Sequence, residues 1–368
     1  MTSSPSTTYS FLGASKFGPP EKVLQFGESN ELPKWSDDSA EEVLIRVEYA
    51  ELNPVDLQKL NGGPRSGQDV PDPPMVVGYG GSGTVVQVNN AGSSSTNTGG
   101  GGDNDGDLLK DESLQVDDKV IFLADPRRKG ALATHVVCNV RSVCKLTAAM
   151  ETEKAAAIPL AGCTALESLD KLNLDSGAES ILIVGGAGGV GSWATRLVRS
   201  MHPKITTIHC TASSLESKAW CRQNGATNVF GHDEILQNLK GGREGSVARI
   251  LCLAEPTQEL WKALTEVIQP YGKICLVVAG KSIGALDLGF LFFKSASVLT
   301  ETIFSSQRTN FQHVVPSKLM KRILDSGTDV PFQRSASWKT ALNHEDTDNI
   351  LTQLGTGHTC GKLVMKID

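Results

Sequence analysis

The chain has 368 residues, of which 39% are hydrophobic, and a formal net charge of −6. This length is sufficient for two domains with sizeable cores. The acidic balance and scattered basic residues exclude a nucleic-acid-binding stripe, and no apolar stretch approaches the roughly 18 residues that cross a membrane. Neither nucleic acid nor a membrane is therefore an expected partner.

The N-terminus and the cysteines indicate a cytoplasmic protein. The first ten residues are rich in Ser and Thr but lack Arg and an apolar core, so they support neither a signal peptide nor a transit peptide. No two of the eight cysteines form a C-x-x-C pair, and several fall in predicted buried strands. This distribution is typical of reduced core thiols rather than of a disulfide framework.

Residues 1–154 are predicted to form a β-rich, barrel-like domain. Short alternating segments broken by Gly and Pro indicate strands, and they cover residues 43–47, 83–88, 119–123 and 131–137. Residues 91–107, AGSSSTNTGGGGDNDGD, contain no apolar residue after the first. Such a segment buries too little surface to offset its ordering entropy, so we expect a disordered surface loop. A tolerated insertion explains it most simply, and a regulatory element is the alternative.

A glycine-rich turn marks a second domain, predicted over residues 155–300. The apolar run 180–184 precedes it, and Gly186, Gly188 and Gly191 have the G-x-G-x-x-G spacing. In a dinucleotide site the first glycine allows a tight turn, the second lets backbone approach a pyrophosphate, and the third allows close helix–strand packing. A helix predicted over 190–199 would direct its N-terminal N–H groups at the phosphates. Taken alone, the spacing also fits a glycine-rich connection in some other α/β protein.

The segments that follow favour the dinucleotide interpretation. Strands are predicted over 204–211, 225–230, 247–254 and 273–279, and helices over 215–224 and 258–268. Strands that alternate with helices of about ten residues are typical of a doubly wound parallel sheet. We therefore predict an α/β fold with a Rossmann domain. Residues 301–368, with helices near 318–324 and 347–354 and a strand over 361–367, are expected to return to the first domain and complete it.

The end of the second Rossmann strand bears on the choice of cofactor. An NAD site places an acid there to bind the ribose 2′-hydroxyl, whereas this chain reads Thr-Ala-Ser-Ser-Leu-Glu-Ser-Lys over 211–218. Small hydroxyls and a cation suit a 2′-phosphate better, so we favour NADPH held by Ser213 and Lys218. As an alternative, Ser213 and Glu216 form an S-x-x-E capping box, and Lys218 is a solvated helix residue.

Motifs along nearly the whole chain carry a family resemblance. They are LNPVD at 52–56, VVGYGGSG at 76–83, residues 155–166, the glycine turn, Gly225-Ala226, GKIC at 272–275, KSAS at 294–297 and Gly361-Lys362. The chain resembles the medium-chain dehydrogenase/reductases, specifically their zinc-lacking quinone oxidoreductase branch and the proteins labelled zinc-type alcohol dehydrogenase-like. The resemblance implies a GroES-like fold for the catalytic domain.

The zinc ligands of related alcohol dehydrogenases are missing. That superfamily binds catalytic zinc through a Cys, the His of a Gly-His-Glu motif, and a later Cys or Asp, and zinc needs three such ligands. Here no Cys precedes residue 138 and no His precedes residue 135. Tyr79 and Gly80 stand at the motif's His and Glu, and the four-cysteine lobe for structural zinc is also absent. We expect no metal.

The resemblance also implies specific cofactor contacts. It places Asn53 near the nicotinamide and substrate, and Thr164 near the phosphates on the nicotinamide side. Gly188, Gly189 and Val190 would hold the pyrophosphate within the turn that ends at Gly191. Lys362 would contact the cofactor from the returning C-terminal segment. The alternatives are ordinary turn chemistry for Asn53, a helix cap for Thr164 and a surface position for Lys362.

Without a Lewis acid, the substrate must accept hydride readily, as quinones and activated alkenes do. We therefore expect an NADPH:quinone oxidoreductase, with a reductase of 2-alkenals or enones as the alternative and a low-turnover NADPH-binding protein as a third possibility. Tyr79 is a candidate proton donor, or an aromatic residue that fills the vacated metal pocket. The resemblance further suggests a homodimer.

Overall fold

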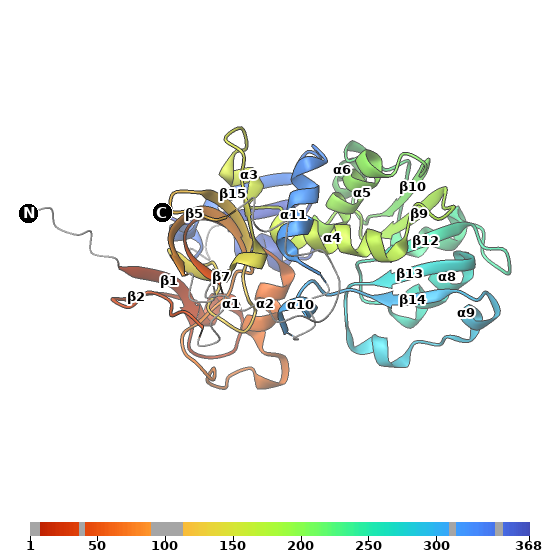
Figure 1. The fold of residues 1–368 in the computed structure, drawn as a ribbon. Helices are drawn as coiled ribbons and strands as arrows, with labels where there is room; N and C mark the ends of the chain where they lie inside the picture. Colours follow the sequence, from red (N-terminus) through yellow and green to blue (C-terminus); the bar gives the residue numbers. More distant parts are fainter. Residues whose placement is uncertain (1–7, 37–40, 90–112, 309–313, 343–348) are drawn as a thin grey trace, which may run out of the picture.

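The structure is a computed structural model that describes residues 8–36, 41–89, 113–308, 314–342 and 349–368. Two domains lie side by side, with helix α4 (Pro159–Leu172) between them (Figure 1). The predicted loop at 91–107 falls outside the described residues. In the described part of the chain, no helix is long and apolar enough to cross a membrane.

The first domain is built on a seven-stranded sheet and a three-stranded sheet. The larger sheet contains β3 (Glu42–Leu52), β5 (Gly80–Asn89), β6 (Lys119–Leu123), β7 (His135–Asn139), β8 (Val143–Lys145), β15 (Phe332–Ser337) and β16 (Lys362–Lys366). The smaller contains β1 (Tyr9–Ala14), β2 (Gln25–Ser29) and β4 (Met75–Val76). The segment predicted as a strand over 131–137 begins later, at His135.

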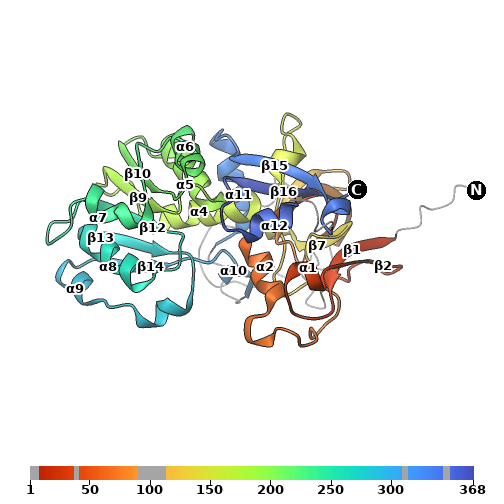
Figure 2. The ribbon, with the colours of Figure 1, turned by 180° about the vertical axis from the view of Figure 1, so that it is seen from behind.

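The C-terminal segment is part of this domain. Strand β16 pairs antiparallel with β3, with Leu363 opposite Leu52 and Val364 opposite Glu51. Figure 2 shows β15 and β16, in blue, beside the early strands, although about 300 residues separate them in sequence. Because the last strand pairs with β3, the chain's return brings Lys362 next to Asn53.

The second domain contains a six-stranded sheet in the order β11-β10-β9-β12-β13-β14, and all its neighbouring strands are parallel. The strands are β9 (Ser180–Val184), β10 (Thr207–Thr211), β11 (Asn228–Phe230), β12 (Val247–Cys252), β13 (Ile268–Leu276) and β14 (Ser297–Thr300). The predicted doubly wound fold is confirmed. Strand β13 starts five residues before the predicted 273, and β14 was not predicted.

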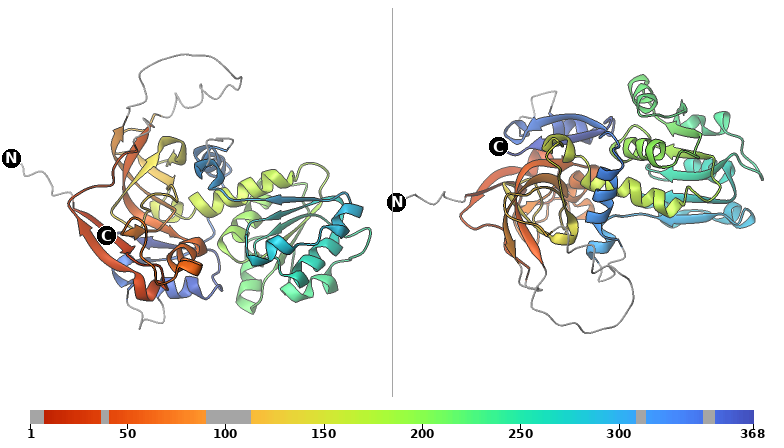
Figure 3. Two further views of the ribbon diagram at one scale, coloured as in Figure 1. Left: turned by 90° about the horizontal axis from the view of Figure 1, so that it is seen from below. Right: turned by 45° about the horizontal axis from the view of Figure 1, so that its top comes forward.

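Helices cover both faces of this sheet (Figure 3). Along β9, Ile181 and Ile183 pack in the core cluster that includes α4 and α5, whereas Leu182 packs in the cluster of Trp261 on α8. Successive side chains of a strand point to opposite faces, so a strand buried on both faces is apolar throughout. The helices are α5 (Gly189–Met201), α6 (Leu215–Gln223), α7 (Ile235–Asn238), α8 (Gln258–Val267) and α9 (Gly289–Phe293).

Short helices connect the remaining elements. They are α1 (Pro20–Val23), α2 (Pro54–Asn61), α3 (Thr152–Ala155), α10 (Ser305–Arg308), α11 (Pro316–Asp325) and α12 (Ile350–Gly355). Helix α11 packs against α4. The cluster around α4 takes side chains from both sheets, including Ile121 of β6 and Ile181 of β9. The inner ends of the two domains therefore share one core.

Candidate active site

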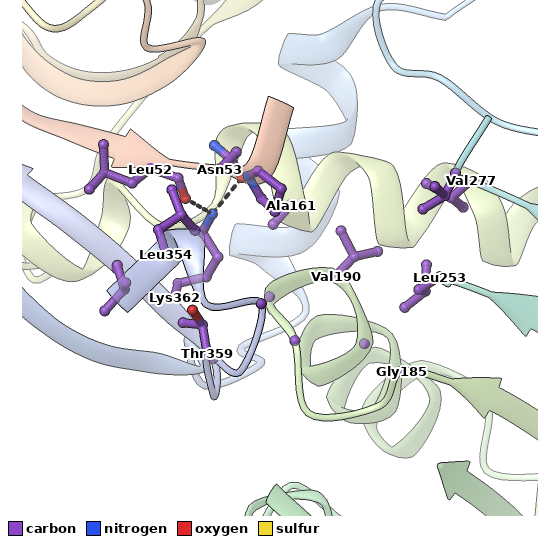
Figure 4. Close-up of a pocket in the computed structure, with 18 residues that line it drawn as sticks. Leu52, Asn53, Ala161, Gly185, Val190, Leu253, Val277, Leu354, Thr359 and Lys362 are labelled. Carbon is purple, nitrogen blue, oxygen red and sulfur yellow. Dashed lines mark hydrogen bonds between the residues drawn. The ribbon is translucent and has the colours of Figure 1, made fainter. Parts of the chain in front are cut away.

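A cavity lies where the two domains meet, and three segments line it. These are the end of β3 with Leu52 and Asn53, the glycine turn from Gly185 to Gly191, and the return segment that includes Gly361 and Lys362 (Figure 4). Apolar side chains, among them Leu253, Val277 and Leu354, make up much of the remaining wall. Residues predicted on opposite domains are thus brought to one cavity.

The glycine turn has the local geometry of a phosphate cradle. A Cβ on Gly191 would lie 2.4 Å from the Gly185 carbonyl oxygen, and one on Gly186 would lie 2.7 Å from the Cβ of Cys210. A Cβ on Gly188 would meet only the Gly185 oxygen, at 3.7 Å. The outer two glycines are therefore required for packing, while the surface at Gly188 is open. Helix α5 begins at Gly189, so its N-terminal N–H groups lie at the cavity.

This geometry fits a dinucleotide at Gly188, Gly189, Val190 and Gly191, all of which line the cavity. Gly186 does not line it, because this residue packs against β10 beneath the turn. The backbone of the turn is anchored there, since the Gly186 N–H donates to the Thr211 carbonyl at 3.0 Å.

On the opposite wall, Lys362 reaches Asn53. The Lys362 ammonium donates hydrogen bonds to the Leu52 carbonyl at 2.8 Å and to Asn53 Oδ1 at 2.6 Å (Figure 4). Both side chains are buried. A Cβ on Gly189 would come within 2.5 Å of the Lys362 Cδ, so the lysine stem crosses directly over the start of α5. The alternative of a surface position for Lys362 is therefore wrong.

Two buried carboxylates surround this pair. Glu51 Oε1 lies 3.7 Å from the Lys362 Nζ and accepts from Asn53 Nδ2 at 3.0 Å. Asp56 accepts from the N–H of Asn53 at 2.8 Å and from the N–H of Gly78 at 2.9 Å. Burial raises the pKa of Asp56 to about 7, against the lowering effect of those N–H groups. Burial lowers the pKa of Lys362, and both carboxylates counteract this.

Tyr79 lies in the core cluster that joins the two domains. It is 1% exposed, and its ring makes an edge contact with Phe304 at a centroid distance of 5.2 Å. The Lys59 ammonium is 5.2 Å from the ring centroid. Burial raises the pKa of Tyr79, and the Asp56 carboxylate raises it further. These contacts favour the packing role, and Tyr79 does not line the cavity.

Thr164 is buried inside α4, well past the start of this helix at Pro159. It is therefore not a helix cap. It lies one turn beyond Ala161, which does line the cavity.

Ser213 lies between the end of β10 and the start of α6, and Lys218 lies on α6; neither residue lines the cavity. Ser213 is exposed, and the N-cap of α6 is Ser214, whose hydroxyl accepts from the Ser217 N–H at 3.0 Å. The predicted Ser213–Glu216 capping box is therefore wrong, because the helix starts one residue later. Lys218 pairs with Glu234, with 3.6 Å between Nζ and Oε2. Sequence reasoning overlooked this acid, which follows the next strand, β11.

Comparisons with known proteins agree with this architecture. Residues 39–148 match the alcohol dehydrogenase GroES-like domain. The chain is 27% identical over 272 residues, 72% of each chain, to a zinc-type alcohol dehydrogenase-like protein of Staphylococcus aureus. It is 36% identical to 2-methylene-furan-3-one reductase of Solanum lycopersicum over 163 residues, 44% of this chain and 38% of the tomato protein. A quinone oxidoreductase structure from Coxiella burnetii superposes with a TM-score of 0.73 at 23% identity, covering 98% of this chain and 100% of the other.

These likenesses support a place for the chain in the medium-chain dehydrogenase/reductase superfamily.

The chain differs from the Gly-His-Glu pattern of the zinc-binding members of that superfamily, because Tyr79 and Gly80 stand at its second and third positions. Among the residues that the structure describes, no group of three or more His, Cys, Asp or Glu side chains is placed to hold a metal ion. Glu51 is a buried acid that no motif suggested, and it lies behind the cavity wall, where it accepts a hydrogen bond from Asn53. The sequence could have indicated Glu51 only as a charged residue near the otherwise buried and mostly apolar C-terminal end of β3.

Proposed function

We propose that this chain is an NADPH-dependent reductase that transfers a hydride to a quinone without zinc. The observation that carries the proposal is the cavity in which the open turn at Gly188 faces the Asn53–Lys362 pair. A bound nicotinamide would supply the hydride. The residue types at 79 and 80 offer no zinc ligand of the Gly-His-Glu kind, so the acceptor must itself be electron-poor.

The chain's own residues have three tasks in this reaction. Gly188 and the start of α5 bind the pyrophosphate through N–H groups. The apolar wall with Leu253 and Val277 excludes water, which strengthens the electrostatic interactions inside the site. The Lys362 ammonium places a positive charge beside the cavity, where negative charge develops on a reduced acceptor.

Reduction of an enone or 2-alkenal is the second candidate. The 36% identity to a 2-methylene-furan-3-one reductase supports it, although that match covers 44% of this chain. The same cavity and hydride donor serve both reactions, and only the acceptor differs. A low-turnover NADPH-binding protein is the third candidate.

An assay of NADPH oxidation separates these candidates. The oxidation is monitored as the decrease in NADPH absorbance. The assay uses phenanthrenequinone, a short 2-alkenal, and no acceptor. Turnover with the alkenal alone would contradict the quinone proposal, and tight NADPH binding without turnover would favour the third candidate.

The choice of NADPH is tested separately at Lys218. Lys218→Ala should weaken NADPH binding far more than NADH binding, because only NADPH carries the 2′-phosphate. Equal effects on the two cofactors would contradict the assignment of Ser213 and Lys218.

We also propose that the protein is a homodimer and that it is located in the cytoplasm. Light scattering of the purified protein tests the homodimer, and fractionation of cells tests the location.

A further inference from the structure

Glu51 is a fully buried carboxylate beside the cavity, with a relative exposure of 0%. Its Oε1 accepts three hydrogen bonds, from Asn53 Nδ2 at 3.0 Å, from the N–H of Leu160 at 3.0 Å and from the N–H of Ala161 at 3.3 Å. The last two belong to the first turn of α4, where N–H groups have no partner within the helix. A carboxylate at this position is also favoured by the helix dipole.

The orientation of the Asn53 amide depends on this carboxylate. Its Nδ2 donates to Glu51, and its Oδ1 accepts from the Lys362 ammonium at 2.6 Å. The opposite orientation would direct NH₂ at an ammonium and C=O at a carboxylate, so the charges of Glu51 and Lys362 together select one rotamer. The atoms of Asn53 that face the cavity are thereby fixed.

Stability alone does not explain a carboxylate here. The Oε2 of Glu51 is buried without a hydrogen-bond partner among the described residues, and an unpaired buried polar atom is destabilising. Burial raises the pKa of Glu51, and the Lys362 ammonium counteracts this. Two other ionisable groups are close to this pair. The carboxylate of Asp56, on α2, also raises the pKa of Lys362, and the buried thiol of Cys163, on α4, lies near Glu51.

The partner strand leaves the space that Glu51 needs. Glu51 on β3 is directly opposite Gly80 on β5. A Cβ on Gly80 would lie 3.4 Å from Glu51 Oε1, 3.1 Å from the Pro159 Cβ and 3.5 Å from the Leu160 nitrogen. A side chain at either of these paired positions therefore points at the same end of α4.

We propose that Glu51 is a positioning residue of the cofactor cavity, which holds the Asn53 amide in one orientation and supplies the countercharge that keeps the Lys362 ammonium at the cavity wall. The proposal rests on the proposed NADPH site. It assigns to Glu51 no contact with substrate or cofactor, because its action passes through its two neighbours.

Glu51→Gln is the sharpest test, because it removes the charge and preserves the shape. The amide oxygen can accept the same N–H groups of α4 in place of Oε1, and the NH₂ replaces the unpartnered Oε2. An opposite charge within about 4–6 Å shifts a pKa by about 1–3 units. We therefore expect NADPH binding, measured by fluorescence titration against pH, to weaken at a midpoint at least about one pH unit lower than in the wild type.

The matched control is Glu48→Gln. Glu48 lies on the same strand and pairs with Lys119 away from the cavity, so its variant should bind NADPH with the wild-type pH profile. A second pair of variants tests the location of the charge. Glu51→Ala should weaken binding, and Glu51→Ala with Gly80→Glu should regain at least half of the lost affinity on a logarithmic scale.

The outcomes separate this inference from the proposed reaction. A wild-type pH profile in Glu51→Gln, or no recovery in the double variant relative to Glu51→Ala, would overturn the role of Glu51 even if the enzyme reduces quinones. NADPH binding with the expected shift but no turnover would leave Glu51 in its role and overturn the reaction. Failure of the wild type to bind NADPH would overturn both.

Discussion

Two alanine substitutions in the glycine turn should separate packing from cofactor binding. A Cβ on Gly191 would lie 2.4 Å from the Gly185 oxygen and 2.7 Å from the Gly186 Cα, and both are backbone atoms that cannot rotate away. A Cβ on Gly188 would have an ordinary contact of 3.7 Å with the Gly185 oxygen. Gly191→Ala must therefore move α5 away from β9, whereas Gly188→Ala only covers the surface that a pyrophosphate would approach.

The expected magnitudes differ accordingly. Overpacking of a tight contact costs about 1–3 kcal/mol, and a domain of this size loses about 2–4 °C of Tm for each kcal/mol. Gly191→Ala should therefore lower the Tm by about 2–12 °C. At Gly188, which is the N-cap of α5, Ala is a poorer cap than Gly, but it also reduces the entropy of the unfolded chain by about 0.4–1 kcal/mol. These opposed effects should leave the Tm within about 2 °C of the wild type.

The assay measures the Tm of the ligand-free proteins and the Kd for NADPH. Gly188→Ala should keep its Tm and lose about tenfold or more in affinity, which corresponds to about 1.4 kcal/mol. Gly284→Ala is the control, because a Cβ on Gly284 meets no atom within 4 Å. The reasoning is refuted by an unchanged Kd in Gly188→Ala, or by an equal fall of Tm in the Gly188 and Gly191 variants.

Three further substitutions test the electrostatics of the site. Glu234→Gln removes the carboxylate 3.6 Å from Lys218, so NADPH should bind several-fold more tightly and NADH should not; titrations in which both cofactors gain equally would contradict this. Tyr79→Phe should keep kcat within about threefold if the buried ring only packs, whereas a fall of 100-fold or more would identify the hydroxyl as a proton donor. The pKa of Asp56 is raised to about 7 in the folded protein. Between about pH 4 and 7, Asp56 is therefore protonated in the folded protein but ionised in the unfolded chain. As a result, the contribution of Asp56 to the free energy of unfolding decreases as the pH rises through this range. Chemical denaturation of Asp56→Asn should show a smaller fall over the same range, and a curve parallel to the wild type would contradict it.

The elements that the sequence predicted best are those with local signals. Strand β9 has the predicted bounds, and α6 and α8 each differ from the predicted helices by one residue at the C-terminal end. An apolar strand followed by a glycine turn depends only on neighbours in the chain, so its pattern is visible in a short window. The fold class followed from the alternation of such windows.

The errors arose where tertiary contacts override local preference. Strand β13 begins at Ile268 and continues through Pro270 and Gly272, residues that are typical of turns. Its neighbour β14 has only four residues, and both of its ends, Ser297 and Thr300, are polar. The N-cap of α6 is Ser214 and not the predicted Ser213. The two neighbouring serines are equivalent as caps in the sequence, so the sequence alone did not distinguish them.

The role of Glu51 could not be predicted, because most of its partners are distant in sequence. Apart from Asn53, its partners are α4, which begins more than 100 residues later, and Lys362, which is 311 positions away. In the sequence it is a single acid before the Asn-Pro-Val-Asp motif. Only the pairing of β16 with β3, which places Val364 opposite Glu51, brings the lysine within reach.

The return segment explains how one cavity can depend on both domains. The N–H of Gly361 donates to the Ala187 carbonyl of the glycine turn at 2.8 Å, and the next residue directs its ammonium at Asn53. Gly361 has a φ of +64°, and a Cβ there would lie 2.5 Å from the Pro331 oxygen, so only glycine allows this bend without strain. Two consecutive residues therefore join the phosphate cradle to the Asn53 amide. Any movement of the glycine turn on cofactor binding must act on the position of Lys362, and hence on the Glu51–Asn53 network behind it.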